Sequence, residues 1–431
     1  MGVLFNLTQE YFGKKVRIED RVIHMDGVET IEHDFIDKCG KQQYASYRIK
    51  DTYVYSDYFA PEPLVKLVKT IIQRDGNECD LNFIDVSNVK SFMGLFKDSD
   101  FNGDISDWDV KEAVSMEEMF MGSKFNGDIS RWKTPKLNSM YHMFKESQFN
   151  GDISEWDVSR VSNMIGLFDG SPFNQDISKW KTSGVRLMNS MFADCPFNGD
   201  ISEWDVSGAT SMTFMFYKNK SFNKDISEWK TGNVNNMQSM FNKSIFNGDI
   251  SEWDVSEVTD MNNMFYDSLF DKDISKWKTG NVNDMSGMFH YSQFNGDISE
   301  WDVGKVKDMS SMFSHSSFNG DISGWNVQNV ESMNYMFADS SFDRDISGWK
   351  TIKVTKMTGM FSNSSFNQDI SGWNVEKVKD VSFMFFRAKK FNKDLSRWEF
   401  ENLENVDAAF SQSPLQDNPP KWYLDFYKKQ P

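Results

Sequence analysis

Residues 246–269 read Phe-Asn-Gly-Asp-Ile-Ser-Glu-Trp-Asp-Val-Ser-Glu-Val-Thr-Asp-Met-Asn-Asn-Met-Phe-Tyr-Asp-Ser-Leu, and variants of this stretch recur through most of the chain. The phenylalanine is position 1 of each repeat, and each repeat is named after it. A fixed period of 24 residues, with one extra residue in two repeats, is the signature of a solenoid. The thirteen repeats begin at Phe101, Phe125, Phe149, Phe173, Phe197, Phe222, Phe246, Phe270, Phe294, Phe318, Phe342, Phe366 and Phe391.

Apolar residues hold the same positions in every repeat. Position 5 is Ile or Leu, position 8 is Trp, position 16 is mostly Met and position 20 is Phe. Positions 8 and 10 alternate with polar neighbours, which predicts a strand. Positions 13, 16, 19 and 20 have helical spacing, which predicts a short helix or a single turn. The sequence therefore predicts an α/β repeat solenoid with leucine-rich-repeat-like coils, a parallel sheet, and a continuous core of Met and Phe.

The two ends of the chain do not follow the repeat. We predict an N-terminal α+β domain over residues 1–79, a solenoid over 80–412 that starts with a half-repeat, and a C-terminal cap over 413–431. The first domain is interpreted as a cap on the open end of the solenoid, and a separate recognition or anchoring module is the alternative. Trp422 follows Trp398 by 24 residues, which indicates a degenerate final repeat.

Local signals predict three features of the N-terminal domain. Val16–Met25 and Val28–Phe35 flank an Asp-Gly pair, which predicts a hairpin. Tyr44–Tyr58 has aromatic residues at strand-like spacing. A Pro-Glu-Pro stretch at 61–63 then opens a predicted helix that runs through Arg74, with Leu64, Leu67, Val68 and Ile71 on one face.

Composition excludes several classes of function. The net charge of -17, without a block of Lys or Arg, argues against nucleic-acid binding. Three scattered cysteines and five histidines at unrelated repeat positions indicate neither a metal site nor a catalytic centre. We therefore expect no enzymatic activity, no cofactor and no membrane insertion. In the absence of a signal peptide, lipobox or apolar span, the expected location is the cytoplasm or a virion, with the cell surface as the alternative.

The phrase Asp249–Phe265 resembles the BspA-like surface-protein repeats, a leucine-rich-repeat-like family found in mycoplasma lipoproteins and in proteins of large DNA viruses. The resemblance covers roughly residues 80–412. It implies adhesion, recognition or assembly, and it supplies no catalytic residues. Trp stands at position 8 where leucine-rich repeats have their structural Asn, so their usual backbone-bonding ladder is not expected.

Position 4 is Asp in every repeat. Each carboxylate either caps its own turn by accepting backbone N–H groups, which we favour, or contributes to a column that binds calcium. Position 3, where Gly alternates with long polar side chains, is predicted to face water. The column of structural carboxylates consists of Asp104, Asp128, Asp152, Asp176, Asp200, Asp225, Asp249, Asp273, Asp297, Asp321, Asp345, Asp369 and Asp394.

Charge is depleted at positions 7 and 9 of three late repeats. An interface core is typically depleted in charged residues, which makes this stretch the candidate contact for a protein partner, and neutral drift is the alternative. Elsewhere the charges at position 9 alternate in sign, which predicts electrostatic pairing between adjacent repeats. We predict a non-enzymatic interaction scaffold, either a structural or assembly component, as in a virion, or an adhesin or recognition protein. The candidate contact residues are Gly324, Asn326, Gly348, Lys350, Gly372 and Asn374.

Overall fold

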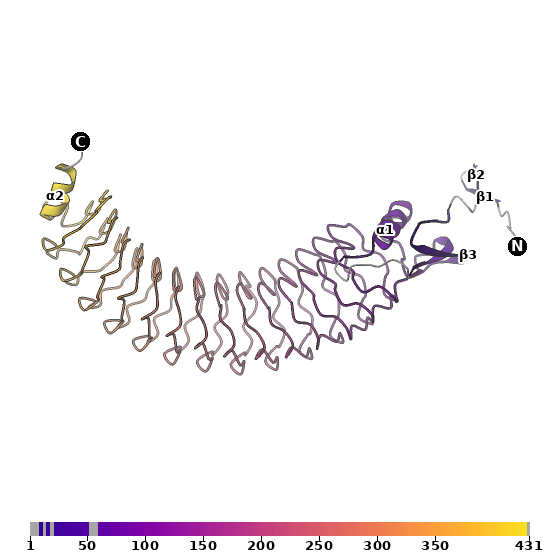
Figure 1. Ribbon diagram of the computed structural model, residues 1–431, viewed down its shortest axis with the longest axis horizontal. Coiled ribbons are helices and arrows are strands. Elements are labelled where there is room, and N and C mark those ends of the chain that lie inside the picture. Colours follow the sequence, from indigo (N-terminus) through magenta and orange to yellow (C-terminus); the bar gives the residue numbers. More distant parts are fainter. Residues whose placement is uncertain (1–7, 12–13, 18–20, 51–58, 429–431) are drawn as a thin grey trace. The chain divides into compact units, whose positions relative to one another are not determined.

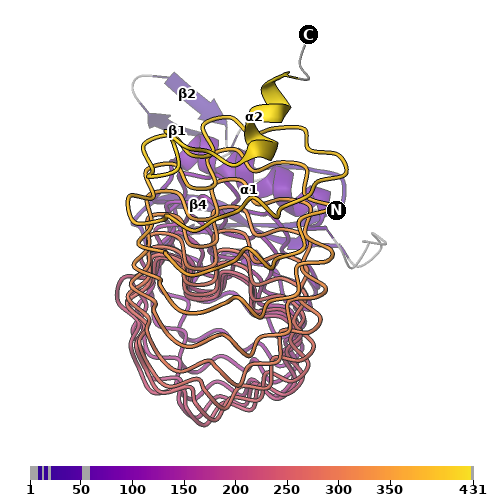
Figure 2. The same ribbon diagram turned by 90° about the vertical axis from the view of Figure 1, so that its left-hand side faces the viewer.

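The computed structural model describes residues 8–11, 14–17, 21–50 and 59–428. It divides into two compact units, Met1–Val185 and Arg186–Pro431, and the boundary falls within the Phe173 repeat. In each unit the repeats form successive coils (Figure 1), and the coils of the second unit share nearly the same outline in the turned view (Figure 2). The chain is thus a repeat solenoid within each unit, whereas the domain boundaries at 79 and 412 stay predictions.

Backbone hydrogen bonds join successive coils through positions 14–22. The N–H groups of positions 16, 18, 20 and 22 donate to the carbonyls of positions 15, 17, 19 and 21 of the next coil. In the Phe246 repeat, for example, Met261 donates to Asp284 at 3.0 Å and Asp267 donates to His290 at 2.8 Å. Isolated parallel bridges also pass through position 15, as between Asp260 and Asp284. We call this run of positions the inter-coil ladder.

The strand predicted within each repeat is wrong, and of the predicted short helix or single turn only turns occur. Residues 101–412, all of which the structure describes, contain no helix, and their strand pairing is limited to single bridges. The segment predicted to be helical carries the inter-coil ladder instead. Positions 18 and 22 lie in the left-handed region in all thirteen repeats, as at Asn263 with φ of 53° and Asp267 with φ of 48°. Left-handed residues four apart interrupt any right-handed helix, so the α/β and parallel-sheet assignments are not supported.

The predicted core of stacked side chains is confirmed within each unit. Phe265, at position 20, is fully buried and stacks on Phe241 and Phe289 of the adjacent coils, with ring centroids 5.9 and 5.8 Å apart. It also stacks on Phe270, which begins the next repeat, at 4.2 Å. Each coil therefore completes its core only with the rings of its neighbours, as expected for units too small to fold alone.

In the N-terminal unit, five described elements precede the half-repeat, and a sixth, β5, lies within it. β3 pairs with β4 in antiparallel fashion, and β4 pairs with β5 in parallel. The predicted helix is confirmed as α1, with Leu64, Leu67, Val68 and Ile71 buried. The described elements of this unit are β1 (Thr8–Tyr11), β2 (Lys14–Arg17), β3 (Val28–Ile36), β4 (Gln42–Ile49), α1 (Glu62–Asp75) and β5 (Ile84–Asp85).

The hairpin predicted around residues 26–27 is wrong. β3 instead turns into β4 through residues 37–41, where the N–H of Asp37 donates to the carbonyl of Lys41 at 2.9 Å. The Asp37 carboxylate accepts the N–H of Lys41 at 2.8 Å, and Gly40 supplies a φ of 79°. The backbone groups of this turn are satisfied by hydrogen bonds within the turn itself. The Asp-Gly pair at 26–27 does not connect two paired strands. Of the strand predicted over 44–58, β4 covers the first part, and residues 51–58 lie outside the described residues.

Both chain ends place a non-repeat element against a coil. β5 occupies positions 8 and 9 of the half-repeat, and the N–H of Tyr47 in β4 donates to the carbonyl of Phe83 at 3.0 Å. At the other end lies α2 (Lys421–Lys428), whose Trp422 indole donates to the carbonyl of Leu395 at 3.0 Å. Trp422 thus makes the bond that position 8 makes in a regular repeat, which agrees with a degenerate final repeat.

Candidate functional site

Two rows of side chains bond the coils to one another. In the first row, the buried Trp of position 8 donates its indole N–H to the carbonyl of position 5 in the preceding coil, at 3.0–3.2 Å. Trp277, for example, donates to Ile250 at 3.0 Å. The indole satisfies a buried carbonyl, so position 8 serves structure rather than binding.

In the second row, the side-chain oxygen of position 2 accepts the N–H of position 2 in the next coil. Asn247 accepts from Asp271 at 2.9 Å, and the same bond recurs along both units. The expectation that no such ladder exists is therefore wrong, because the ladder has moved from position 8 to position 2. Asn or Asp at position 2 in all thirteen repeats was the signal that could have found it.

The Asp column at position 4 lies at the turn that follows it. In every repeat its carboxylate accepts the backbone N–H of position 6 at 2.8–3.0 Å. The hydrogen bond from Ser251 lowers the pKa of Asp249 below its usual value, and neighbouring carboxylates oppose that shift. Among the described residues, no three His, Cys, Asp or Glu side chains are grouped as a metal site requires. Whether the column takes up calcium stays open.

The structure brings the six predicted contact residues onto one side of consecutive coils. Gly324, Gly348 and Gly372 are exposed, and a β-carbon added to any of them would meet open space. Asn326, Lys350 and Asn374 lie exposed two residues further on. We call this group the glycine face. Lys350 is its one charged residue and three of its six residues have no side chain, so a partner surface could approach the backbone closely there.

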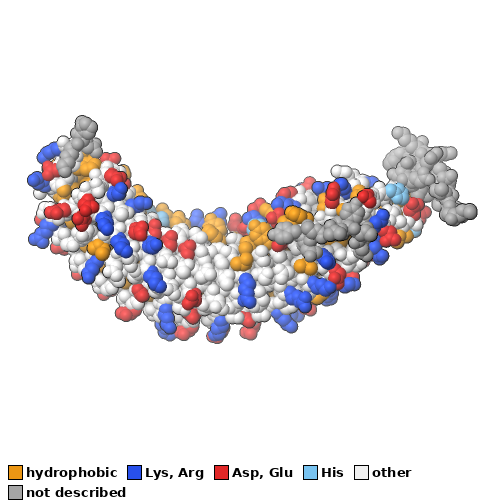
Figure 3. Space-filling model, in the orientation of Figure 1, with side chains coloured by type: hydrophobic (Ala, Val, Ile, Leu, Met, Phe, Trp, Pro, Cys, Tyr) orange, Lys and Arg blue, Asp and Glu red, His pale blue; other side chains and the backbone are white. Residues whose placement is uncertain are grey.

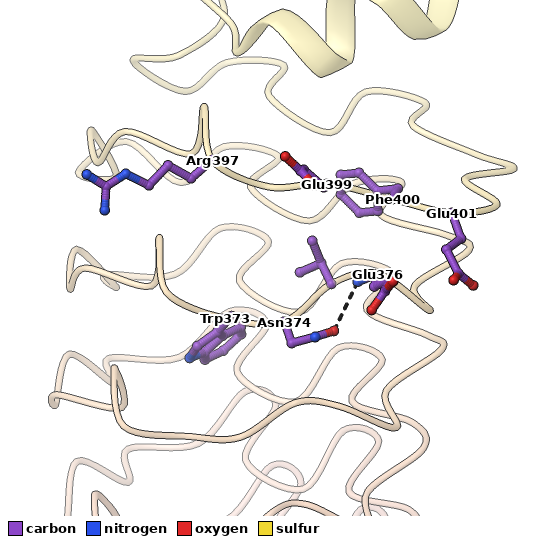
Figure 4. A pocket seen from close by; sticks show the side chains of 8 residues that line it. Trp373, Asn374, Glu376, Arg397, Glu399, Phe400 and Glu401 are labelled. Carbon is purple, nitrogen blue, oxygen red and sulfur yellow. Dashed lines mark hydrogen bonds between the residues drawn. The ribbon is translucent and has the colours of Figure 1, made fainter.

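The glycine face adjoins a shallow pocket between the last two coils. The pocket has a volume of about 340 Å³. Figure 4 shows Trp373 and Asn374 on one coil, Glu399 and Phe400 on the next, and Arg397 and Glu401 at opposite ends. The Asn374 side chain accepts the N–H of Glu376 at 3.2 Å. A smaller pocket of about 260 Å³ lies at the corresponding positions of the Phe149 and Phe173 repeats, so such grooves arise from the coil geometry itself.

Adjacent coils pair opposite charges at position 7 as well as at position 9, where Lys181 and Lys278 act electrostatically on Asp157 and Asp254. At position 7, ion pairs join Lys276 to Glu252 at 2.6 Å, Lys179 to Glu155 at 3.0 Å and Arg131 to Asp107 at 3.1 Å. The residue at position 10 alternates together with position 9. It is Thr where position 9 is Lys, and Val where position 9 is Asp or Asn. The buried Thr279 hydroxyl donates to the carbonyl of Asp302 at 2.9 Å. Each of the exposed ion pairs at position 7 contributes about 0.2–1 kcal/mol at most to the stability of the fold.

Sequence reasoning missed a group of aromatic side chains on the exposed side of the inter-coil ladder. Tyr266, His290, Tyr291 and His315 come from three consecutive repeats at positions 21 and 22, and their rings contact one another. The space-filling view shows acidic and basic side chains interspersed, with separate groups of hydrophobic side chains between them (Figure 3). The sequence does show aromatic residues at positions 18, 21 and 22. That their rings contact one another follows only from the way the coils are stacked.

His290 in this group predicts a pH-dependent stability. Burial lowers the pKa of His290 to about 4, helped by the charge of His315 and opposed by Asp267. The unfolded chain keeps a pKa near the ordinary 6.5, so it takes up a proton first as the pH falls. Stability should therefore fall between about pH 6.5 and pH 4. We expect His290→Asn to show a smaller drop in melting temperature from pH 7 to pH 5 than the unmodified chain. Equal drops in the two proteins would contradict this assignment.

Neither helix of the described residues, α1 or α2, has the length and apolar character that crossing a bilayer requires.

Comparisons with known proteins place the repeat array in a family. Searches of curated proteins and of solved structures returned no match. One family model matches in five overlapping segments, at residues 67–172, 139–245, 163–269, 243–341 and 317–422. Because these segments together span residues 67–422, the chain belongs to the family described as Mycoplasma protein of unknown function, DUF285.

Proposed function

We propose that this protein is a non-enzymatic protein-interaction scaffold that acts through lateral contacts of its coils. One observation carries the proposal. The side chains that recur in all thirteen repeats are taken up by coil-to-coil bonding, turn capping and core packing, as for Asp249, Trp253 and Phe265. Exposed positions such as 7 vary from repeat to repeat, as at Glu252, Lys276 and Gly324, so the framework presents a surface whose chemistry changes along the array.

Within this function, a structural or assembly role, as in a virion, is the reading we favour, because a repeated rigid framework suits lateral contacts between many copies. The alternative is an adhesin or recognition protein at a cell surface, in keeping with the resemblance to BspA-like surface-protein repeats. The mycoplasma origin in the family's description is compatible with that alternative. Both readings require a protein partner and neither requires a nucleic acid, a cofactor or catalysis.

The glycine face supplies the first test. Substituting Gly324→Glu, Gly348→Glu and Gly372→Glu together should abolish partner binding or assembly without lowering the melting temperature. Three carboxylates would be buried at the contact, which is costly, whereas in the free protein they point into open space. Cross-linking and mass spectrometry on source material would identify the partner, and the purified pair would then be titrated by calorimetry.

A matched control places three glutamates elsewhere. Gln293→Glu, Ser317→Glu and Ser341→Glu add the same number of carboxylates at exposed sites of position 24. This control should bind normally. If the glycine-face variant binds its partner as well as the control does, the contact surface lies elsewhere.

A further inference from the structure

The aromatic group on the inter-coil ladder is exposed enough to bind a ligand. His290 and Tyr291 stack with ring centroids 4.5 Å apart, and Tyr291 stacks on His315 at 4.4 Å. Tyr266 meets His290 edge to face at 4.9 Å. Tyr291 is 49% exposed and Tyr335, two repeats further along, is 42% exposed. We call the ladder positions 14–22 of the Phe246, Phe270, Phe294 and Phe318 repeats, with these five rings, the aromatic face.

Two of these rings belong to residues with a left-handed backbone. Tyr291 has a φ of 55° and Tyr335 a φ of 56°, in a region that bulky side chains rarely occupy. The same conformation recurs at these two positions in every repeat, where the residues range from Gly359 and Asn363, which adopt it readily, to Phe214 and Lys218. The Tyr335 ring lies where a β-carbon on Gly359 would stand, so a glycine makes room for it.

The aromatic face is also acidic, and its neighbours are not. Its ladder positions carry six acidic side chains and one basic side chain, Lys307, a net charge of -5. The same positions of the two preceding repeats carry only Lys218 and Lys243 as charged residues, and the two following repeats have a net charge of +2. The aromatic face is thus flanked on both sides by repeats whose ladder positions carry a net positive charge. The six acidic residues are Asp260, Asp267, Asp284, Asp308, Glu331 and Asp339.

Two of these carboxylates lie beside the rings, and two others lie next to each other. The Asp339 carboxylate is 3.6 Å from the His315 ring nitrogen, and Asp267 acts electrostatically on both Tyr266 and His290. Asp260 and Asp284 are bridged in adjacent coils. Burial, together with the charge of Asp284, raises the pKa of Asp260. Like charges on adjacent strands are unfavourable, and a cation placed between them would relieve the repulsion.

The chain itself shows how a cation meets these rings. The Lys243 ammonium lies 5.7 Å from the centre of the Tyr266 ring, and Lys218 lies 5.1 Å from that of Tyr217. Both distances are within the range of a cation–π interaction. The exposed rings, the net negative charge of the aromatic face and the lysine that already lies over a Tyr ring together point to a positively charged ligand.

We propose that the aromatic face binds an extended, arginine-rich segment of a partner protein. Four coils at strand spacing span about 19 Å, the length of about six extended residues. Guanidinium groups stack on the tyrosine rings and pair with the carboxylates beside them, two modes that arginine combines. This proposal rests on the interaction function proposed above and gives it a second surface, distinct from the glycine face.

The test measures binding of fluorescein-labelled hexa-arginine by anisotropy at physiological salt, with hexa-citrulline as the uncharged probe of similar shape. Tyr291→Asn with Tyr335→Asn should weaken hexa-arginine binding by about tenfold while keeping or raising the melting temperature, since asparagine suits the left-handed backbone. The control is Phe214→Asn with Phe383→Asn, which relieves the same backbone conformation outside the aromatic face. This control should bind as the unmodified chain does.

A second pair of variants separates the acidic residues of this face from the overall negative charge. Asp260→Asn, Asp284→Asn and Asp308→Asn keep the turn-capping acceptor that Asn236 provides at the same position. They should weaken hexa-arginine binding by about tenfold. Asp273→Asn, Asp297→Asn and Asp321→Asn remove equal charge from the position-4 column and should have little effect. Equal losses in the two triple variants, or equal affinity for the two peptides, would overturn the proposal.

The two proposals fail independently. If the aromatic-face variants bind hexa-arginine normally while the glycine-face variant still loses its partner, the arginine-binding inference is wrong and the scaffold function stands. If the glycine-face variant keeps its partner and the aromatic-face variants lose hexa-arginine binding, the contact assigned to the glycine face is wrong and the arginine-binding inference stands.

Discussion

Replacing Trp277 by alanine is expected to lower the free energy of unfolding of the Arg186–Pro431 unit by about 3–5 kcal/mol from lost packing alone. Its ring is 3% exposed and stacks on Trp301 with centroids 6.3 Å apart. The substitution also removes the N–H that satisfies the Ile250 carbonyl. A buried carbonyl without a partner adds about 1–3 kcal/mol. Urea denaturation followed by circular dichroism measures the total.

Trp277→Phe separates the two contributions. Phenylalanine keeps most of the stacking surface and loses only the indole donor, so its cost should be well below that of alanine. A substitution at a solvent-exposed site of the same coil, Lys278→Ala, serves as the control and should change stability little. If Trp277→Ala were no more destabilising than Lys278→Ala, the stacked rings would not be what holds the coils together.

The second large effect is expected at Gly103, where a methyl group should destabilise the N-terminal unit by about 1–3 kcal/mol or more. A β-carbon at Gly103 would stand 1.9 Å from the carbonyl oxygen of Cys79, and this backbone group cannot move aside as a side chain can. The prediction that position 3 faces water is therefore wrong for this repeat. The first coil is pressed against the chain that precedes it, a constraint that the later repeats do not share.

Gly127→Ala is the matched control, at the same position of the next repeat. There the added β-carbon meets the ring of Phe125 at 2.8 Å, and six other repeats already hold a long side chain at this position. A ring can shift where a backbone carbonyl cannot, so Gly127→Ala should be tolerated. Thermal melts of the two variants, recorded side by side, test the difference. Similar melting temperatures would show that the close approach at Gly103 relaxes without cost.

Much of the candidate site can be predicted by comparing the repeats with one another. Positions 7 and 9 stood out because Gly324, Gly348 and Gly372 interrupt a run of charged residues, and the structure places them together in the open. The aromatic face was not predictable in this way. His290 and Tyr291 belong to one repeat and His315 to the next, and each looks like an isolated surface substitution until the coil register stacks their rings.

The sequence by itself determined the period, the buried positions and the helix at Glu62–Asp75, because these follow from side-chain chemistry repeated or grouped along the chain. Only the tertiary structure decided the backbone of the repeat. Apolar residues at positions 16, 19 and 20 suit a helix as well as a coil, and the choice depends on where their N–H groups find acceptors. Those acceptors lie in the next coil, as when Phe265 donates to Met288, so no reading of one repeat alone could find them.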